Sequence, residues 1–385
     1  MRRVIVVTSL LVLLWIGWGM AGRLLPDLVP GPSFLMKDTN DLDKIDLTGV
    51  QDPFEAPDIK RALQSGFSRA PLSARPFAIR LGGVTGNEPD LSELQRRLAE
   101  HILRIAPRHV AATLKLAELD YLDGKYEETA AGISKLMELD RPNANTFLDV
   151  LTAMTLQNTS RPAIEELLEE QPAWGARLVS KLARESRDTD FLISLARDYP
   201  ASQDAVVRSL VADGELDRAH AAFLEFLDDE ARTTSSVPFD SRFEQISGAQ
   251  PFNWRINRSF ANIEQRGGLA VSFFGQGRPW IAEQTIKLSP GTYTISFVME
   301  GNLYKGGGSL EWSLQCLDAR EPLMTLSVEE LTSLPEAQVA TFAVPPENCG
   351  YQRLRLSGVA GEFPRTARAL VDEVTVTPAA EVAAP

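Results

Sequence analysis

Hydrophobic residues follow three different patterns along this 385-residue chain. Val4 to Gly22 is an apolar run without a charged residue, whereas Ile59 to Leu227 repeats apolar residues at helical spacing between short Pro or Gly breaks. From Phe239 onward, apolar and polar residues alternate with the period of two that is typical of half-buried β-strands. The pattern predicts a multi-domain protein with an N-terminal membrane helix, an α-helical domain and a C-terminal antiparallel β-sandwich.

The first segment, residues 1–23, has the features of a signal anchor or a signal peptide. Arg2-Arg3 precedes the apolar run, so the N-terminus is expected on the cytoplasmic side. We favour an uncleaved anchor, because two tryptophans in the run suit a membrane interface. Residues 4–22 would then cross a bacterial inner membrane once, with the other domains in the periplasm. Cleavage near Gly19-Met20-Ala21 is the alternative and would give a periplasmic or secreted protein.

Residues 24–57 are rich in proline and aspartate and have no regular apolar period. This composition predicts an extended linker. The whole chain has a formal net charge of −13, and most of its acidity precedes Phe239. That balance argues against nucleic acid or an anionic membrane surface as a partner, because both attract basic patches.

Residues 58–230 are expected to form a domain of helical repeats. The clearest unit, Val110 to Asp140, has a helix on each side of an Asp123-Gly124 turn, and a second, Val206 to Leu227, turns at Gly214. Both units resemble the tetratricopeptide repeat, at positions Leu116, Ala117, Gly124, Tyr126, Leu139 and Asp140 of the first and Gly214, Leu216 and Ala219 of the second. The resemblance implies an α-solenoid whose groove binds a partner protein, and a rigid spacer is the alternative.

The last third of the chain is expected to be a β-sandwich over residues 239–378. A polar hinge at 231–238 would precede it, and a disordered tail at 379–385 would follow it. Apolar residues alternate on both sides of Pro290-Gly291 and predict a hairpin. Strands are expected at Phe243–Ile246, Trp254–Asn257, Leu269–Phe274, Ala282–Leu288, Thr292–Glu300, Ser309–Leu317, Gln338–Val344, Arg353–Ser357 and Ala369–Thr377, which favours a jelly roll.

The order of short motifs in this module resembles carbohydrate-binding-module-like jelly rolls. The motifs are Phe243-Glu244, Pro251–Trp254, Gly268–Val271, Gln284–Tyr293 and Leu370–Val374. With the helical repeats, the whole chain resembles accessory proteins of bacterial envelope or exopolysaccharide assembly. The resemblance implies glycan binding.

It also implies a structural calcium between the first and last strands, at Glu244 and Asp372. Arg242 stands where the family has an acidic or small residue. A calcium ion takes six or more oxygen ligands, so two carboxylates alone would not complete the site.

Sugar recognition needs flat aromatic faces and planar polar side chains. Four aromatic residues are candidate platforms: Trp254, Trp280, Tyr304 and Tyr351. Trp254 and Trp312 are expected in the core, whereas Trp280 and Tyr304 are expected in glycine-containing loops, where ligand-binding residues concentrate. Candidate polar partners are Arg278, Gln276 and Asn302.

The two cysteines, Cys316 and Cys349, both lie in the predicted sandwich. Because the chain is expected to be exported, we predict that they form a disulfide. With three histidines, all in the helical part, the sequence indicates no imidazole-based metal site or catalytic triad.

The sequence as a whole favours a non-enzymatic, membrane-tethered periplasmic scaffold or adaptor. Its helical repeats would bind a protein and its sandwich would contact a polysaccharide, with no cofactor other than the calcium. A purely structural interaction protein without a sugar site is one alternative. A glycan-active hydrolase or lyase is another, since the sandwich contains the strand carboxylates Glu283, Glu300, Glu311 and Glu373.

Overall fold

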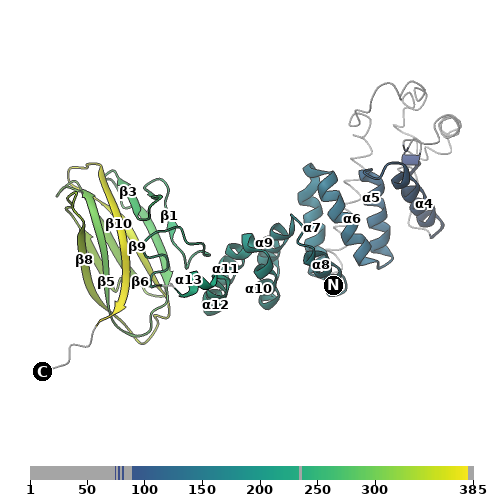
Figure 1. Cartoon of the computed structure of the whole chain (residues 1–385). Coiled ribbons are helices and arrows are strands. Elements are labelled where there is room, and N and C mark those ends of the chain that lie inside the picture. The colour runs from purple at the N-terminus through teal and green to yellow at the C-terminus, as the bar shows by residue number, and fades with distance from the viewer. Residues whose placement is uncertain (1–73, 75–76, 79, 82–88, 234–235, 380–385) are drawn as a thin grey trace, which may run out of the picture. The chain divides into compact units, whose positions relative to one another are not determined.

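The computed structural model describes residues 74, 77–78, 80–81, 89–233 and 236–379 (Figure 1). The predicted membrane segment and linker, and residues 380–385 of the predicted tail, lie outside this part. None of the helices in this part has the length and hydrophobicity that a membrane span requires. The chain divides into two compact units, residues 1–172 and residues 173–385.

The first unit is helical where the apolar period predicts helices. Its elements are α4 (Pro89–Ile105), α5 (Val110–Leu122), α6 (Tyr126–Leu139), the 3-10 turn η2 (Arg141–Asn143), α7 (Ala144–Thr155) and α8 (Arg161–Glu169). Gly124 has a φ of +76° in the turn between α5 and α6, a conformation that glycine adopts without strain. A Cβ at Gly132 would lie 3.1 Å from that of Ala117, so small residues let these two helices pack closely.

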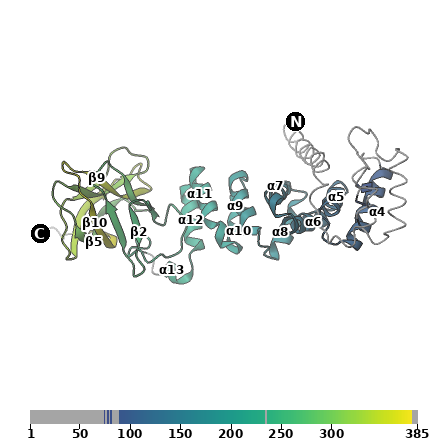
Figure 2. The same ribbon diagram turned by 90° about the horizontal axis from the view of Figure 1, so that it is seen from above.

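The second unit begins with helices and ends with the sandwich. Its helical elements are α9 (Gly175–Glu185), α10 (Thr189–Asp198), the 3-10 turn η3 (Pro200–Ser202), α11 (Gln203–Ala212), α12 (Leu216–Phe226) and α13 (Asp229–Thr233). α11 and α12 lie side by side (Figure 2) and join at Gly214, whose φ is +81°. Both predicted helix pairs are therefore present, and their identity as tetratricopeptide repeats stays a prediction.

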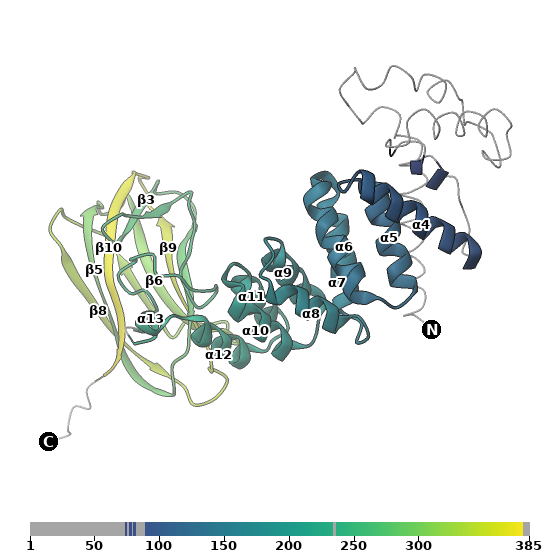
Figure 3. The ribbon, with the colours of Figure 1, turned by 45° about the vertical axis from the view of Figure 1, so that its right-hand side comes forward.

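Two five-stranded antiparallel sheets form the sandwich (Figure 3). The first has the order β1-β4-β9-β6-β7, with bounds Arg255–Ile256, Trp280–Ile286, Gln352–Ala360, Gly308–Cys316 and Met324–Val328. The second has the order β2-β3-β10-β5-β8, with bounds Ala261–Ile263, Leu269–Phe273, Ala367–Pro378, Gly291–Asn302 and Glu336–Val344. Their inner faces share one core, in which the rings of Phe297 and Trp312 have centroids 5.6 Å apart.

The strands around Pro290 exist, but the predicted hairpin is wrong. β4 belongs to the first sheet and β5 to the second, so the segment between them crosses from one sheet to the other. Alternation shows which residues of a strand face the core, and both strands face the same core. It does not show which strand is the neighbour.

The predicted strand Phe243–Ile246 is also wrong, because Phe243 and Gln245 have φ angles of +53° and +62°. Phe243 is nevertheless fully buried in the sandwich core. An Asp240 carboxylate oxygen accepts the Glu244 backbone N–H at 2.7 Å and holds this irregular segment. The sequence prediction also missed the short strands β2 and β7.

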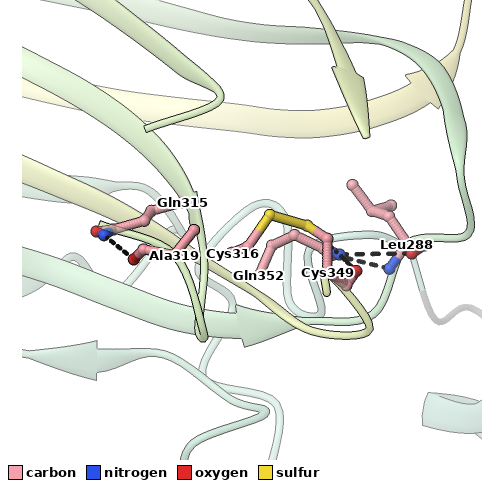
Figure 4. The surroundings of a disulfide bond; sticks show 6 residues. All are labelled: Leu288, Gln315, Cys316, Ala319, Cys349 and Gln352. Atoms are coloured by element: carbon pink, nitrogen blue, oxygen red, sulfur yellow. Dashed lines mark hydrogen bonds between the residues drawn. A yellow bond between two sulfur atoms is a disulfide. The ribbon is translucent and has the colours of Figure 1, made fainter. Parts of the chain in front are cut away.

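The predicted disulfide is present and joins the end of β6 to the segment before β9 (Figure 4). The Cα atoms of Cys316 and Cys349 are 5.0 Å apart. Gln352 is fully buried beside it, where its side-chain amide donates to the Cys349 carbonyl at 2.6 Å and accepts the Leu288 N–H at 2.9 Å. The disulfide and this amide together tie three chain segments at one end of the sandwich.

Candidate functional site

A row of outward-facing residues crosses the first sheet near the start of β4. The antiparallel register places four residues side by side on four strands: Trp280, Ser357, Glu311 and Ser327. We call this set the Trp280 row. Trp312, the next residue of β6 after Glu311, points the opposite way and is fully buried, as predicted for a core residue.

Ion pairs hold the neighbouring row on the same face. This row, which we call the Glu283 row, consists of Arg255, Glu283, Arg355, Ser313 and Thr325. Glu283 accepts from Arg255 Nη1 at 3.0 Å through Oε1, and from Arg355 Nη2 at 2.6 Å through Oε2. The Glu283 side chain is only 12% exposed, whereas the Arg255 and Arg355 side chains are 55% and 36% exposed, so solvent screens the arginine side of these ion pairs.

Two arginines connect the rows and the loop before β4. Arg255 Cζ lies 4.7 Å from the centre of the Trp280 ring, within the range of a cation–π contact. Arg278 donates to Glu311, whose side chain is 13% exposed. The half-buried Trp280 indole therefore lies near guanidinium and carboxylate groups that are paired with one another.

Three glycine-containing loops meet beside the Trp280 row: residues 274–279, 303–307 and 361–366. Backbone hydrogen bonds join them, from Gly361 N to Gly275 O at 3.3 Å, from Phe363 N to Gly306 O at 3.0 Å and from Arg365 N to Gly307 O at 3.0 Å. Gly275 has a φ of +69°, and a Cβ there would collide with the Gly307 carbonyl oxygen. Only glycine allows the first two loops to approach this closely.

Each of these loops presents an exposed aromatic ring. Phe274 is 53% exposed, Tyr304 is 52% exposed and Phe363 is 72% exposed. We call these three rings the loop-end surface. Arg365 Cζ lies 5.8 Å from the centre of the Tyr304 ring. Large exposed rings gathered at one end of a domain are typical of a recognition surface.

The structure brings most of the predicted sugar-binding residues to this end of the sandwich. Gln276 and Arg278 are exposed on the first loop, and Trp280 begins β4 directly after it. Tyr304 is on the neighbouring loop. Asn302 is exposed but belongs to the second sheet, where it lies opposite Arg368.

Two of the four predicted platforms are not available to a ligand. Trp254 is 5% exposed and its indole N–H donates to the Asp240 carbonyl at 3.0 Å, so it is a core residue. Tyr351 is 6% exposed and packs against α12. Conversely, the sequence prediction missed Phe274 and Phe363. Each is followed directly by glycine or proline, and this is the signal that could have identified them.

The described residues do not fit the implied calcium site. The nearest guanidinium atom of Arg242 is 4.0 Å from an Asp372 carboxylate oxygen, and this cationic group lies where a calcium ion would need access. The same Asp372 oxygen accepts the Glu373 backbone N–H at 2.7 Å. Glu244 is exposed, and no group of three or more His, Cys, Asp or Glu side chains gathers anywhere in the described part of the chain.

Of the comparisons with known proteins, only the one with solved structures finds chains similar to this one. The chain matches no protein-family model and no curated protein. A carbohydrate-binding module of family 4 is 21% identical, with 31% of this chain and 77% of that chain covered and a TM-score of 0.25. A xylan-binding domain of family 22 is 13% identical, with 34% of this chain and 88% of that chain covered and a TM-score of 0.25. A family 61 module solved in complex with β-1,4-galactotriose is 11% identical, with 36% of this chain and 91% of that chain covered and a TM-score of 0.26.

Proposed function

We propose that the sandwich binds a polysaccharide at the loop-end surface and the adjoining Trp280 row. The observation that carries this proposal is the exposure of Tyr304 and Phe363 on loops that their own backbone hydrogen bonds hold in place. Flat rings pack against the apolar C–H faces of sugars, and rigidly held loops are where binding residues concentrate.

Polar side chains of the first loop and of the Trp280 row supply the hydrogen bonds that sugar hydroxyls require. The exposed Gln276 amide can donate and accept, Arg278 can only donate, and the Glu311 carboxylate accepts. Because Arg278 and Glu311 already bind each other, both groups are oriented before a ligand arrives. Such preorganisation lowers the entropic cost of binding.

The arrangement of carboxylates favours binding without catalysis. A glycosidase needs two carboxyl groups facing each other across the scissile bond, one of them protonated as the general acid. Glu283 and Glu311 share one face of the first sheet, but β9 separates their strands, and each binds a guanidinium. We therefore propose a non-enzymatic role, and release of reducing ends or unsaturated products from a bound polysaccharide would contradict it.

For the rest of the chain we keep the scaffold role that its sequence indicates. Residues 4–22 would anchor the protein in a bacterial inner membrane, and the helices would bind a partner protein in the periplasm. The jelly-roll connectivity and a role in exopolysaccharide or envelope assembly belong to the same proposal. A pull-down with the full-length protein in detergent tests partner binding, and recovery of no specific protein would favour the spacer alternative.

Polysaccharide binding is tested by affinity electrophoresis of the full-length protein against a panel of neutral and acidic polysaccharides. Tyr304→Ala and Trp280→Ala should each weaken binding about tenfold, the effect of losing roughly 1.4 kcal/mol of contact free energy. Val339→Ala is the matched control, because Val339 is 60% exposed on the second sheet.

Retention by no polysaccharide, or equal retention of all three variants and the parent protein, would contradict the proposed site. The purely structural alternative would then be favoured. Unfolding midpoints of the variants show whether a loss of binding reflects a loss of folding.

A further inference from the structure

We infer that the polysaccharide is acidic, and that Lys305 and Arg365 bind its carboxylate groups. This inference rests on the proposed function and names the class of glycan that the same site selects. Its starting point is the surroundings of Tyr304. Arg365 Cζ lies 5.8 Å from the centre of that ring, and Lys305 is the next residue in the same exposed loop.

These two cations differ from the other basic residues of the site in having no ion-pair partner within the described part of the chain. Arg278 and Arg355 are bound to Glu311 and Glu283. The three loops contain one acidic residue, Glu362, against three basic residues. The cations that flank Tyr304 are therefore available to an external anion.

The position of Arg365 is set by the backbone. Its N–H donates to the Gly307 carbonyl at 3.0 Å, and Gly307 N donates to the Tyr304 carbonyl at 2.8 Å. Because Arg365 Cζ lies over the Tyr304 ring, 5.8 Å from its centre, a sugar ring that contacts the edge of Tyr304 would have a guanidinium close to it. Arginine binds a carboxylate through two parallel N–H groups, so a uronic acid on this ring could bind in a defined orientation.

Local cations matter because the chain as a whole repels polyanions. With a net charge of −13, its overall field opposes the approach of an acidic polymer. An acidic polysaccharide would bind only where exposed cations are concentrated and free. Screening by salt should weaken such binding, whereas it would leave the stacking of a neutral sugar almost unchanged.

The test compares polygalacturonate, alginate and hyaluronan with the carboxyl-reduced form of each, using the full-length protein and isothermal titration calorimetry. At least one native polymer should bind about tenfold more tightly than its reduced form, as expected for a charge-assisted hydrogen bond. Arg365→Gln and Lys305→Gln should each lower the affinity for the native polymer more than the affinity for its reduced form. Arg320→Gln is the control, because Arg320 is exposed at the opposite end of β6.

Equal affinity for the native and reduced polymers would overturn the acidic specificity and leave polysaccharide binding intact. The same conclusion follows if only neutral polysaccharides of the wider panel bind. Binding of none of them would overturn both proposals. Binding of phosphatidylglycerol vesicles, with loss in the Lys305 and Arg365 variants and no binding of polygalacturonate, alginate or hyaluronan, would assign these cations to a lipid surface instead.

Discussion

The carboxylate of Asp217 on α12 accepts a hydrogen bond at 2.9 Å from the hydroxyl of Tyr351, which lies 134 residues later and directly before β9. The same oxygen accepts from Lys287 Nζ at 2.7 Å, and this Nζ is 5.2 Å from the centre of the Tyr351 ring. Helix α12 is thereby bound to the ends of two strands. These contacts agree with the grouping of α9–α13 and the sandwich in one unit. The hinge predicted at 231–238 stays a prediction, and residues 231–233 of it belong to α13.

Aromatic packing beneath this polar contact should contribute most of the stability of the junction. Phe223 is 3% exposed, and its ring centroid lies 5.2 Å from that of Phe239 and 5.5 Å from that of Phe252. Phe223→Ala should lower the unfolding free energy of the second unit by about 3–5 kcal/mol. Urea unfolding followed by tryptophan fluorescence measures this, because the tryptophans of the described part all lie in the second unit.

The neighbouring residue provides the control for this substitution. Leu224 is 36% exposed, so Leu224→Ala should lower the unfolding free energy by less than about 1 kcal/mol. Equal losses in the two variants would show that the aromatic cluster does not stabilise the junction.

The same junction should weaken in acid, because His220 packs against the rings of Phe252 and Tyr351, whose centroids lie 5.0 and 6.0 Å from its own. Burial lowers the pKa of His220, the charge of Lys287 lowers it further, and Asp217 opposes both effects. The unfolded chain therefore binds a proton more readily than the folded one. The contribution of neutral His220 to the free energy of unfolding is fully present at pH values above the ordinary histidine pKa of 6.5. It is lost as the pH falls toward the lower pKa of the folded state.

Replacing His220 by glutamine should flatten this pH dependence, as measured by urea unfolding of the second unit above and below pH 6.5. His109 is the matched control, because burial also lowers its pKa and it belongs to the first unit. His109→Asn keeps a side-chain acceptor for the Ala112 N–H at the start of α5. If His109→Asn flattens the pH dependence of the second unit as strongly as His220→Gln does, His220 is not the source of that pH dependence.

Local features of the fold could be predicted from the sequence, and the pairing of strands could not. Gly124 and Gly214 mark turns that need a positive φ, so the helix pairs around them were predictable from a few residues. β4 and β5 were recognisable as strands, but their assignment to different sheets depends on partners such as β9, which begins 66 positions after β4 ends at Ile286. Such long-range pairing leaves no trace in local alternation.

In the candidate site too, residues that the local sequence marks as loop residues were predictable, whereas contacts between distant strands were not. Tyr304 and Gln276 stand beside glycines, which indicates loops, and both lie on exposed loops in the structure. Phe274 was missed because it was assigned to the end of the predicted strand Leu269–Phe274, whereas β3 ends at the buried Phe273 and Phe274 is exposed. The ion pair between Glu283 and Arg355 joins residues 72 positions apart, so only the register of β4 with β9 brings them together.

Reduction of the disulfide should destabilise the second unit without unfolding it at neutral pH. Cys316 and Cys349 are 33 residues apart, and a closed loop of that length contributes about 3–4 kcal/mol in the chain-entropy model. Urea unfolding with and without dithiothreitol measures the difference. In a Cys316→Ala/Cys349→Ala variant the reductant should have no effect, and an equal effect there would show that it acts elsewhere.

Loop packing at the candidate site can be separated from backbone strain by comparing two glycines of one loop. Gly275 and Gly277 have φ angles of +69° and +68°, so an alanine at either position should cost about 1–2 kcal/mol of stability through strain. A Cβ at Gly277 meets nothing within 4 Å, whereas one at Gly275 collides with the Gly307 carbonyl oxygen. Gly275→Ala should therefore cost more stability and, by pushing the loop of Tyr304 away, should also weaken polysaccharide binding. Urea unfolding and affinity electrophoresis measure the two effects. Equal binding by both variants would mean that the spacing of these loops does not determine recognition.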